Sequence, residues 1–135
     1  MAQPIKPTVD FNISVVGDTT GKEFVGSFSA KTKLSIREQL KENEVYREVL
    51  GTNGKDADEY SKTLASATSY LMVRVVSSPD WWKSLGFGLD IEDMNLLAAV
   101  NNSCRAAVQA EYKALEDLAT DAEKALKSMQ DKNAS

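Results

Sequence analysis

Three carboxylates in the second half of the chain, Asp90, Glu92 and Asp93, form a group of side chains that could bind a metal ion. Oxygen ligands of this kind suit Ca²⁺, but these three lack the pattern and the ligand spacing of a calcium loop. Asp90 and Asp93 also lie where a helix is expected to begin, and negative charge is favourable near a helix N-terminus. The pattern therefore predicts helix-start residues and no metal site.

A single thiol and one lysine are the other candidates for chemistry. Cys104 lies on an apolar helical stripe, next to Arg105, and its position predicts a buried, unreactive thiol. Lys22 follows two glycines, but the spacing does not match a phosphate-binding loop, and the segment reads as a hairpin turn. The chain has no histidine, which removes the usual general base and most zinc and copper sites. We expect no catalytic residue, no cofactor and no enzymatic activity.

The composition predicts one soluble globular domain. The chain has 135 residues, of which 42% are hydrophobic and 27% charged, and its net charge is −4. An acidic balance argues against a nucleic-acid partner, because phosphate binding needs a concentrated basic face. The start of the chain has no signal-peptide pattern, no apolar stretch is long enough to span a bilayer, and one cysteine fits a reducing compartment. We expect an intracellular protein without membrane contact.

The N-terminal part predicts a β-hairpin over residues 10–30, after a loose lead over 1–9. Phe11, Ile13 and Val15 alternate with smaller or polar residues, and residues 24–29 alternate in the same way. The segment 17–22 between them has turn chemistry. A lone hairpin is marginal in water, so this one must pack on helices or pair with another chain.

Three helices are expected after the hairpin, at about 35–50, 56–76 and 91–128. The first opens with a capping box, Ser35 to Glu38, and ends at Gly51, before a turn at 52–55. In the second, the β-branched content leaves residues 71–76 open as a short strand. The last has no Pro or Gly and would be about 55 Å long, so its part beyond Glu111 is expected to project. Residues 129–135 are expected to be a disordered tail. The fold class is α+β and mostly helical.

Both tryptophans lie in the connection between the last two helices, residues 77–90. Pro79 is expected to stop the preceding segment, and Asp90 to cap the last helix. Neighbouring residues rarely both point inward, so we expect one of Trp81 and Trp82 to be buried and the other exposed. Two interpretations remain open: the pair closes the core, or one member also serves as a docking site.

Four short segments occur in a recognisable order: Glu23-Phe24-Val25-Gly26-Ser27-Phe28, Leu34-Ser35-Ile36-Arg37, Pro79-Asp80-Trp81-Trp82, and Leu89-Asp90 followed by Asp93-Met94-Asn95. In this order they resemble the tail assembly chaperones of long-tailed bacteriophages, in the variant with a proline-X-tryptophan-tryptophan turn. The resemblance covers roughly residues 11–113. Its motifs concern packing and turns rather than catalysis.

The resemblance implies a partner and a place of action. Such chaperones bind the tape measure protein and keep it soluble and extended while tail tube subunits polymerise around it. They act in the host cell cytoplasm and are typically absent from the finished virion. In many of these phages a ribosomal frameshift appends a second domain to a minority of copies. A projecting amphipathic helix also suits helix-on-helix capture, and many copies along one client would add avidity.

The expected partner contacts come from the aromatic turn and the last helix. Further candidate partners are the tail tube subunits and a second copy of the chain. An alternative function is a structural tail or connector subunit of the virion, whose hairpin adds strands between neighbours. The residues expected to contact a partner are Trp81, Trp82, Phe87, Tyr112, Leu115 and Leu118.

Overall fold

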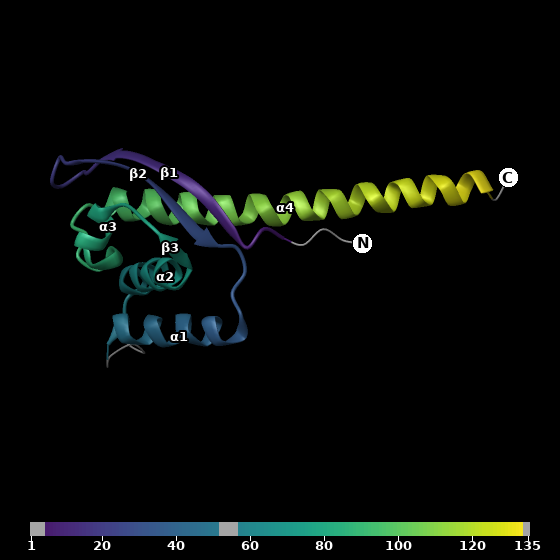
Figure 1. Ribbon diagram of the computed structural model, residues 1–135. Helices are drawn as coiled ribbons and strands as arrows, with labels where there is room; N and C mark the ends of the chain where they lie inside the picture. Colours follow the sequence, from purple (N-terminus) through teal and green to yellow (C-terminus); the bar gives the residue numbers. More distant parts are fainter. Residues whose placement is uncertain (1–4, 52–56, 134–135) are drawn as a thin grey trace.

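The computed structural model describes residues 5–51 and 57–133, with side chains up to residue 130. It has the expected α+β, mostly helical fold, in which a small antiparallel sheet packs on helices (Figure 1). The elements in chain order are β1 (Thr8–Val16), β2 (Glu23–Lys31), α1 (Ile36–Leu50), α2 (Glu59–Arg74), β3 (Val75–Ser77), α3 (Asp80–Ser84), the 3₁₀ turn η2 (Gly86–Gly88) and α4 (Met94–Asn133).

The predicted hairpin is confirmed, with a six-residue loop between β1 and β2. Phe11 pairs with Phe28 across the two strands, and their rings stack with centroids 5.1 Å apart. The expected alternation places Phe11, Ile13, Phe24 and Phe28 on the buried face. The predicted lead is too long, because β1 already begins at Thr8; residues 1–4 of that lead lie outside the described residues.

A short third strand, β3, follows directly on α2 and pairs antiparallel with β2. The expected helix over 56–76 therefore ends at Arg74, and the strand alternative is confirmed for Val75 and Val76. Two successive β-branched residues favour extended backbone, and an open edge of β2 gives them hydrogen-bond partners. The sheet order is β1-β2-β3.

The capping box of α1 forms as predicted and ties the helix to the sheet. The Ser35 hydroxyl accepts from the Glu38 backbone N–H, and the Glu38 carboxylate accepts from the Ser35 backbone N–H. The Lys31 ammonium of β2 pairs with that carboxylate and, together with the Ser35 bonds, lowers the pKa of Glu38 to about 2. Gly51 ends α1 with φ 79°. The predicted turn at 52–55 lies outside the described residues.

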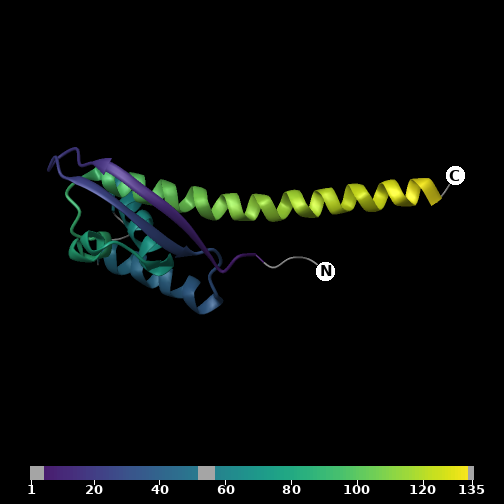
Figure 2. The same cartoon turned by 45° about the horizontal axis from the view of Figure 1, so that its top comes forward.

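The core lies between the sheet, α2 and the first half of α4. Figures 1 and 2 show β1 and β2 lying along this half of α4, while α2 packs below it and α1 packs on α2. The most deeply buried large side chains come from β2, α2, α3 and α4, whereas the only buried residue of α1 is Val45. These side chains are Phe28, Leu71, Trp82, Leu96, Val100 and Cys104.

Helix α4 is continuous over 40 residues, which corresponds to about 60 Å. It starts at Met94 rather than at 91, and it continues to Asn133. The predicted tail is therefore wrong for residues 129–133, because no Pro or Gly stops a helix that its first half has already nucleated. Residues 134 and 135 lie outside the described residues. The expected projection is confirmed: the second half of α4 extends well beyond the rest of the molecule (Figure 1).

Candidate functional site

Trp82 belongs to the core. Its side chain is 1% exposed and meets the Phe28 ring edge to face, with centroids 5.4 Å apart. Gly88 lies so close that a Cβ there would stand 3.0 Å from the indole. A buried indole that fills the gap between α3 and the sheet offers no surface to a partner, so the core interpretation holds for Trp82.

Trp81 is half-buried and fastens the turn to β2. Its indole N–H donates to the backbone carbonyl of Val25 at 3.0 Å, and its ring packs on Phe24 with centroids 5.1 Å apart. Pro79 lies against the same strand, where a Cβ on Gly26 would come within 2.3 Å of the proline ring. The expectation of one inward and one outward tryptophan is thus met only in part, because Trp81 keeps limited exposure.

Phe87 is 50% exposed and has a left-handed backbone, with φ 56°. Gly86 and Gly88 on either side also have positive φ, so the whole turn bends in a sense that L-residues disfavour. Asp90 does not cap α4: its backbone N–H donates to the Leu85 carbonyl within this turn. The helix begins only after Asp93, and its first turn contains no acidic residue.

Asp93 instead joins the start of α4 to the hairpin loop. Its carboxylate accepts from the backbone N–H groups of Thr19 and Thr20, both at 2.7 Å, and from the Thr20 hydroxyl. Burial by itself would raise the pKa of Asp93, but the bonds from Thr20 and Thr19 outweigh it and hold that pKa below its usual value. Gly17 leaves room for the carboxylate, because a Cβ there would lie 2.4 Å from it.

The projecting half of α4, residues 109–133, is here called the arm. No described side chain in the arm is buried, and Leu118, Leu126 and Met129 are 54, 60 and 62% exposed. Apolar and alanine residues recur at three- and four-residue intervals along one face, which spans about 26 Å. This face, the arm stripe, consists of Tyr112, Leu115, Leu118, Ala119, Ala122, Ala125, Leu126 and Met129.

Acidic side chains border the arm stripe on both sides. At 100° per residue, Glu116 and Glu123 lie along one border and Asp121 along the other. Lys113 and Lys124 lie on the opposite face of the helix. None of these three carboxylates forms an ion pair with another residue of the described chain. Lys127 lies next to the border formed by Glu116 and Glu123, and Asp117 lies on the opposite face, so the borders of the arm stripe hold three acidic side chains and one basic side chain.

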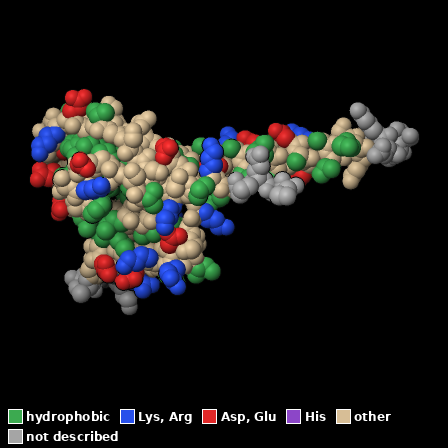
Figure 3. All heavy atoms as spheres, in the orientation of Figure 1, with side chains coloured by type: hydrophobic (Ala, Val, Ile, Leu, Met, Phe, Trp, Pro, Cys, Tyr) green, Lys and Arg blue, Asp and Glu red, His purple; other side chains and the backbone are tan. Residues whose placement is uncertain are grey.

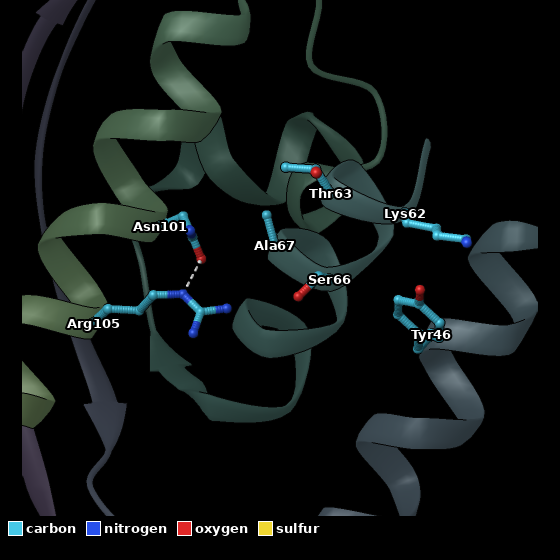
Figure 4. A pocket seen from close by; sticks show the side chains of 7 residues that line it. All are labelled: Tyr46, Lys62, Thr63, Ser66, Ala67, Asn101 and Arg105. Carbon is cyan, nitrogen blue, oxygen red and sulfur yellow. Dashed lines mark hydrogen bonds between the residues drawn. The ribbon is translucent and has the colours of Figure 1, made fainter. Parts of the chain in front are cut away.

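A polar cleft of about 370 Å³ lies between α1, α2 and α4 (Figure 4). Arg105 reaches from α4 toward α2 and donates to the Asn101 side chain at 3.2 Å, while Lys62 leaves α2 toward the α1 side. The Arg74 and Arg105 guanidinium carbons lie 3.7 and 3.9 Å from the Tyr70 ring centroid. Burial raises the pKa of this tyrosine, and Arg74 also pairs with Glu42. These contacts join α1, α2 and α4.

The remaining candidates for chemistry are Cys104 and the acidic side chains. Cys104 is buried as predicted, and burial raises its pKa to about 11 despite Arg74 and Arg105 nearby. Among the described side chains, those of residues 5–51 and 57–130, no three acidic or cysteine side chains are grouped so that they could hold a metal ion. None of the described helices has both the length and the apolar character needed to cross a membrane.

The six residues predicted as partner contacts do not form one surface. Tyr112, Leu115 and Leu118 lie together on the arm stripe, whereas the turn containing Phe87 lies at the opposite end of the molecule (Figure 1). Figure 3 shows hydrophobic and charged side chains side by side along the arm. The prediction omitted Leu126 and Met129, although the three- and four-residue spacing that continues to Met129 was visible in the sequence.

Comparisons of the chain with protein-family models, with curated proteins and with solved structures gave no match.

Proposed function

We propose that this protein is a tail assembly chaperone of a long-tailed bacteriophage, a binding protein rather than an enzyme. It binds the tape measure protein in the host cytoplasm, keeps it soluble while the tail tube assembles, and is absent from the mature virion. The observation that carries the proposal is the arm: half of a 40-residue helix stands outside the core with a continuous apolar stripe. Such a face suits an amphipathic helical client.

Contacts among the sequence segments that carry the family resemblance also support the proposed function. Trp81 and Trp82 of the proline-X-tryptophan-tryptophan turn meet Phe28 of the hairpin segment. Asp93 at the start of α4 binds the loop of the same hairpin. Three of the four motifs that resemble the chaperone family thus contact one another, as expected if they are a shared packing signature.

The proposal is tested by co-expression with the tape measure protein of the same genome. We expect a soluble complex on gel filtration with the natural chain, and an insoluble client with the double variant Leu118→Asp/Leu126→Asp. The matched control is Thr120→Asp/Ser128→Asp, which adds the same charge on exposed positions away from the stripe. An insoluble client with the natural chain would contradict the proposal.

The alternative, a structural virion subunit, is favoured by one observation. Among the residues that the structure describes, no other strand pairs with the outer side of β1, which is nine residues long. Such an edge can add a strand from a neighbouring chain. Mass spectrometry of purified virions separates the two proposals, because a stoichiometric amount of this protein supports the structural role.

A further inference from the structure

We infer that the arm stripe takes a partner helix whose apolar face is bordered by lysine or arginine residues. The inference deepens the proposed function and rests on it, since it specifies the chemistry of the client segment that binds the arm. It follows from the length of the arm stripe, from the sizes of its side chains and from the charges beside it.

The length and shape of the arm stripe fit a helix. From Tyr112 to Met129 it runs nearly straight over about 26 Å, so a partner of about 18 helical residues would cover it. Ala119, Ala122 and Ala125 lie at its centre and the larger side chains toward its ends. Small side chains at a contact allow two helix axes to approach closely.

The charges beside the arm stripe select the partner. Glu116, Asp121 and Glu123 stand where the flanking residues of a packed helix would lie, and none of the three forms an ion pair with a described residue. They outnumber the one lysine at these borders, Lys127, so the borders carry a net negative charge. Opposite charges at flanking positions set partner choice and orientation in paired helices. Lysine or arginine beside the apolar face of the partner would complete these pairs, whereas glutamate there would be repelled.

A second copy of this chain is a poorer occupant for the same reason. Antiparallel pairing of two arms would set Tyr112 against Met129 and Leu115 against Leu126. In that register Glu116 of one copy would meet Glu123 of the other, twice per dimer. Like charges at these positions oppose self-pairing and leave the face available to a basic partner.

Two labelled peptides test the inference on the full chain. Both have 18 residues and the same leucine and alanine face; one has lysines and the other glutamates at the flanking positions. We expect fluorescence anisotropy to show about tenfold tighter binding of the lysine peptide, as a few exposed ion pairs would give. The preference should weaken from about 50 to about 500 mM salt, because salt screens exposed charges.

Reversing the charges on the chain itself is the comparison that matches the charge change between the two peptides. Glu116→Lys/Asp121→Lys/Glu123→Lys should invert the preference, and Asp117→Lys, on the far face, should leave it unchanged. Equal binding of both peptides, a preference for the glutamate peptide, binding of neither, or self-association of the chain at the arm in sedimentation would each overturn the inference.

Binding of the tape measure protein distinguishes a failure of this inference from a failure of the proposed function. If the natural chain and the triple lysine variant capture that client equally well, the proposed function stands and the charge selection is overturned. If the natural chain prefers the lysine peptide but forms no complex with the client, the charge selection stands and the proposed function fails.

Discussion

The two halves of α4 continue one apolar stripe through opposite environments. In the first half, Leu96, Leu97, Val100, Cys104 and Val108 are all buried against the sheet and α2. In the second half, residues of the same spacing are exposed, except Leu115, which is half-buried. The rest of the molecule, here called the head, therefore gains its stability from packing, whereas the arm depends on helix propensity and on the turns already formed at its base.

Because of this difference, the first half of α4 stabilises the fold, whereas the second half is available for binding. A side chain removed from the head leaves a cavity, while one removed from the arm leaves only more solvent around an already exposed helix. The arm is thus free to present apolar side chains to a partner without a change in the head. The predictions below are ordered from the largest expected effect to the smallest.

Trp82→Ala should destabilise the head most. Removing a large aromatic side chain from a core typically costs about 3–5 kcal/mol. The matched change in the arm, Leu126→Ala, should alter the free energy of unfolding by less than about 0.5 kcal/mol, because that side chain is mostly exposed. Urea denaturation followed by circular dichroism measures both. Similar losses for the two variants would remove the distinction between head and arm.

Gly17→Ala should weaken the junction between the hairpin loop and α4. The added methyl would lie 2.4 Å from the Asp93 carboxylate, so the carboxylate or the loop must move. Overpacking of this kind costs about 1–3 kcal/mol. Gly21→Ala is the comparison. It also adds a methyl group to a glycine of the same loop, but that methyl group meets no atom within 4 Å, so its only cost is the strain of an L-residue at φ 72°. A larger loss for Gly21→Ala would contradict the role of Asp93.

Acid should weaken the head through Asp93 and Glu38, whose pKa values are both lowered in the folded state. A lowered pKa adds stability above the ordinary value of the group, and that stability is lost as the pH falls through the folded pKa. The loss of stability in Asp93→Asn, relative to the natural chain, should therefore shrink as the pH falls below the ordinary pKa of an aspartate. Denaturation at several pH values measures it, and a deficit independent of pH would contradict this account.

Removal of most of the arm should have the smallest effect on the head. A chain that ends at Leu115 retains the hydrogen bond from the Lys6 backbone N–H to Glu111 and loses only exposed turns. We expect its free energy of unfolding to change by less than about 0.5 kcal/mol. The truncated chain should also fail to hold the tape measure protein in solution. A destabilised head would show that the arm packs on it in solution.

Local patterns predicted most of the fold, and the errors fall where distant segments meet. The period of two in the hairpin and the capping box at Ser35 are properties of neighbouring residues, and both were confirmed. β3 was left open because three residues are too few for a periodic signal and its partner, β2, lies far away in sequence. The role of Asp93 was missed because its partner Thr19 is 74 residues away.

The candidate site was predictable only in part. The spacing on the last helix indicated Tyr112, Leu115 and Leu118, and the length of the helix indicated that they would project. The aromatic turn was a misleading signal, because two adjacent tryptophans look the same in a sequence whether they fill a core or bind a partner. Only the packing against Phe24 and Phe28 separates these two cases.

Hydrogen–deuterium exchange of the chain with and without the tape measure protein tests the central claim, that the arm is the client-binding surface. In the free chain we expect slow exchange in the first half of α4 and fast exchange in the arm, which has no buried side chains. Addition of the client should slow exchange over residues 112–129 and leave the head unchanged. Protection confined to β1 or to the turn around Phe87, with an unchanged arm, would contradict the claim.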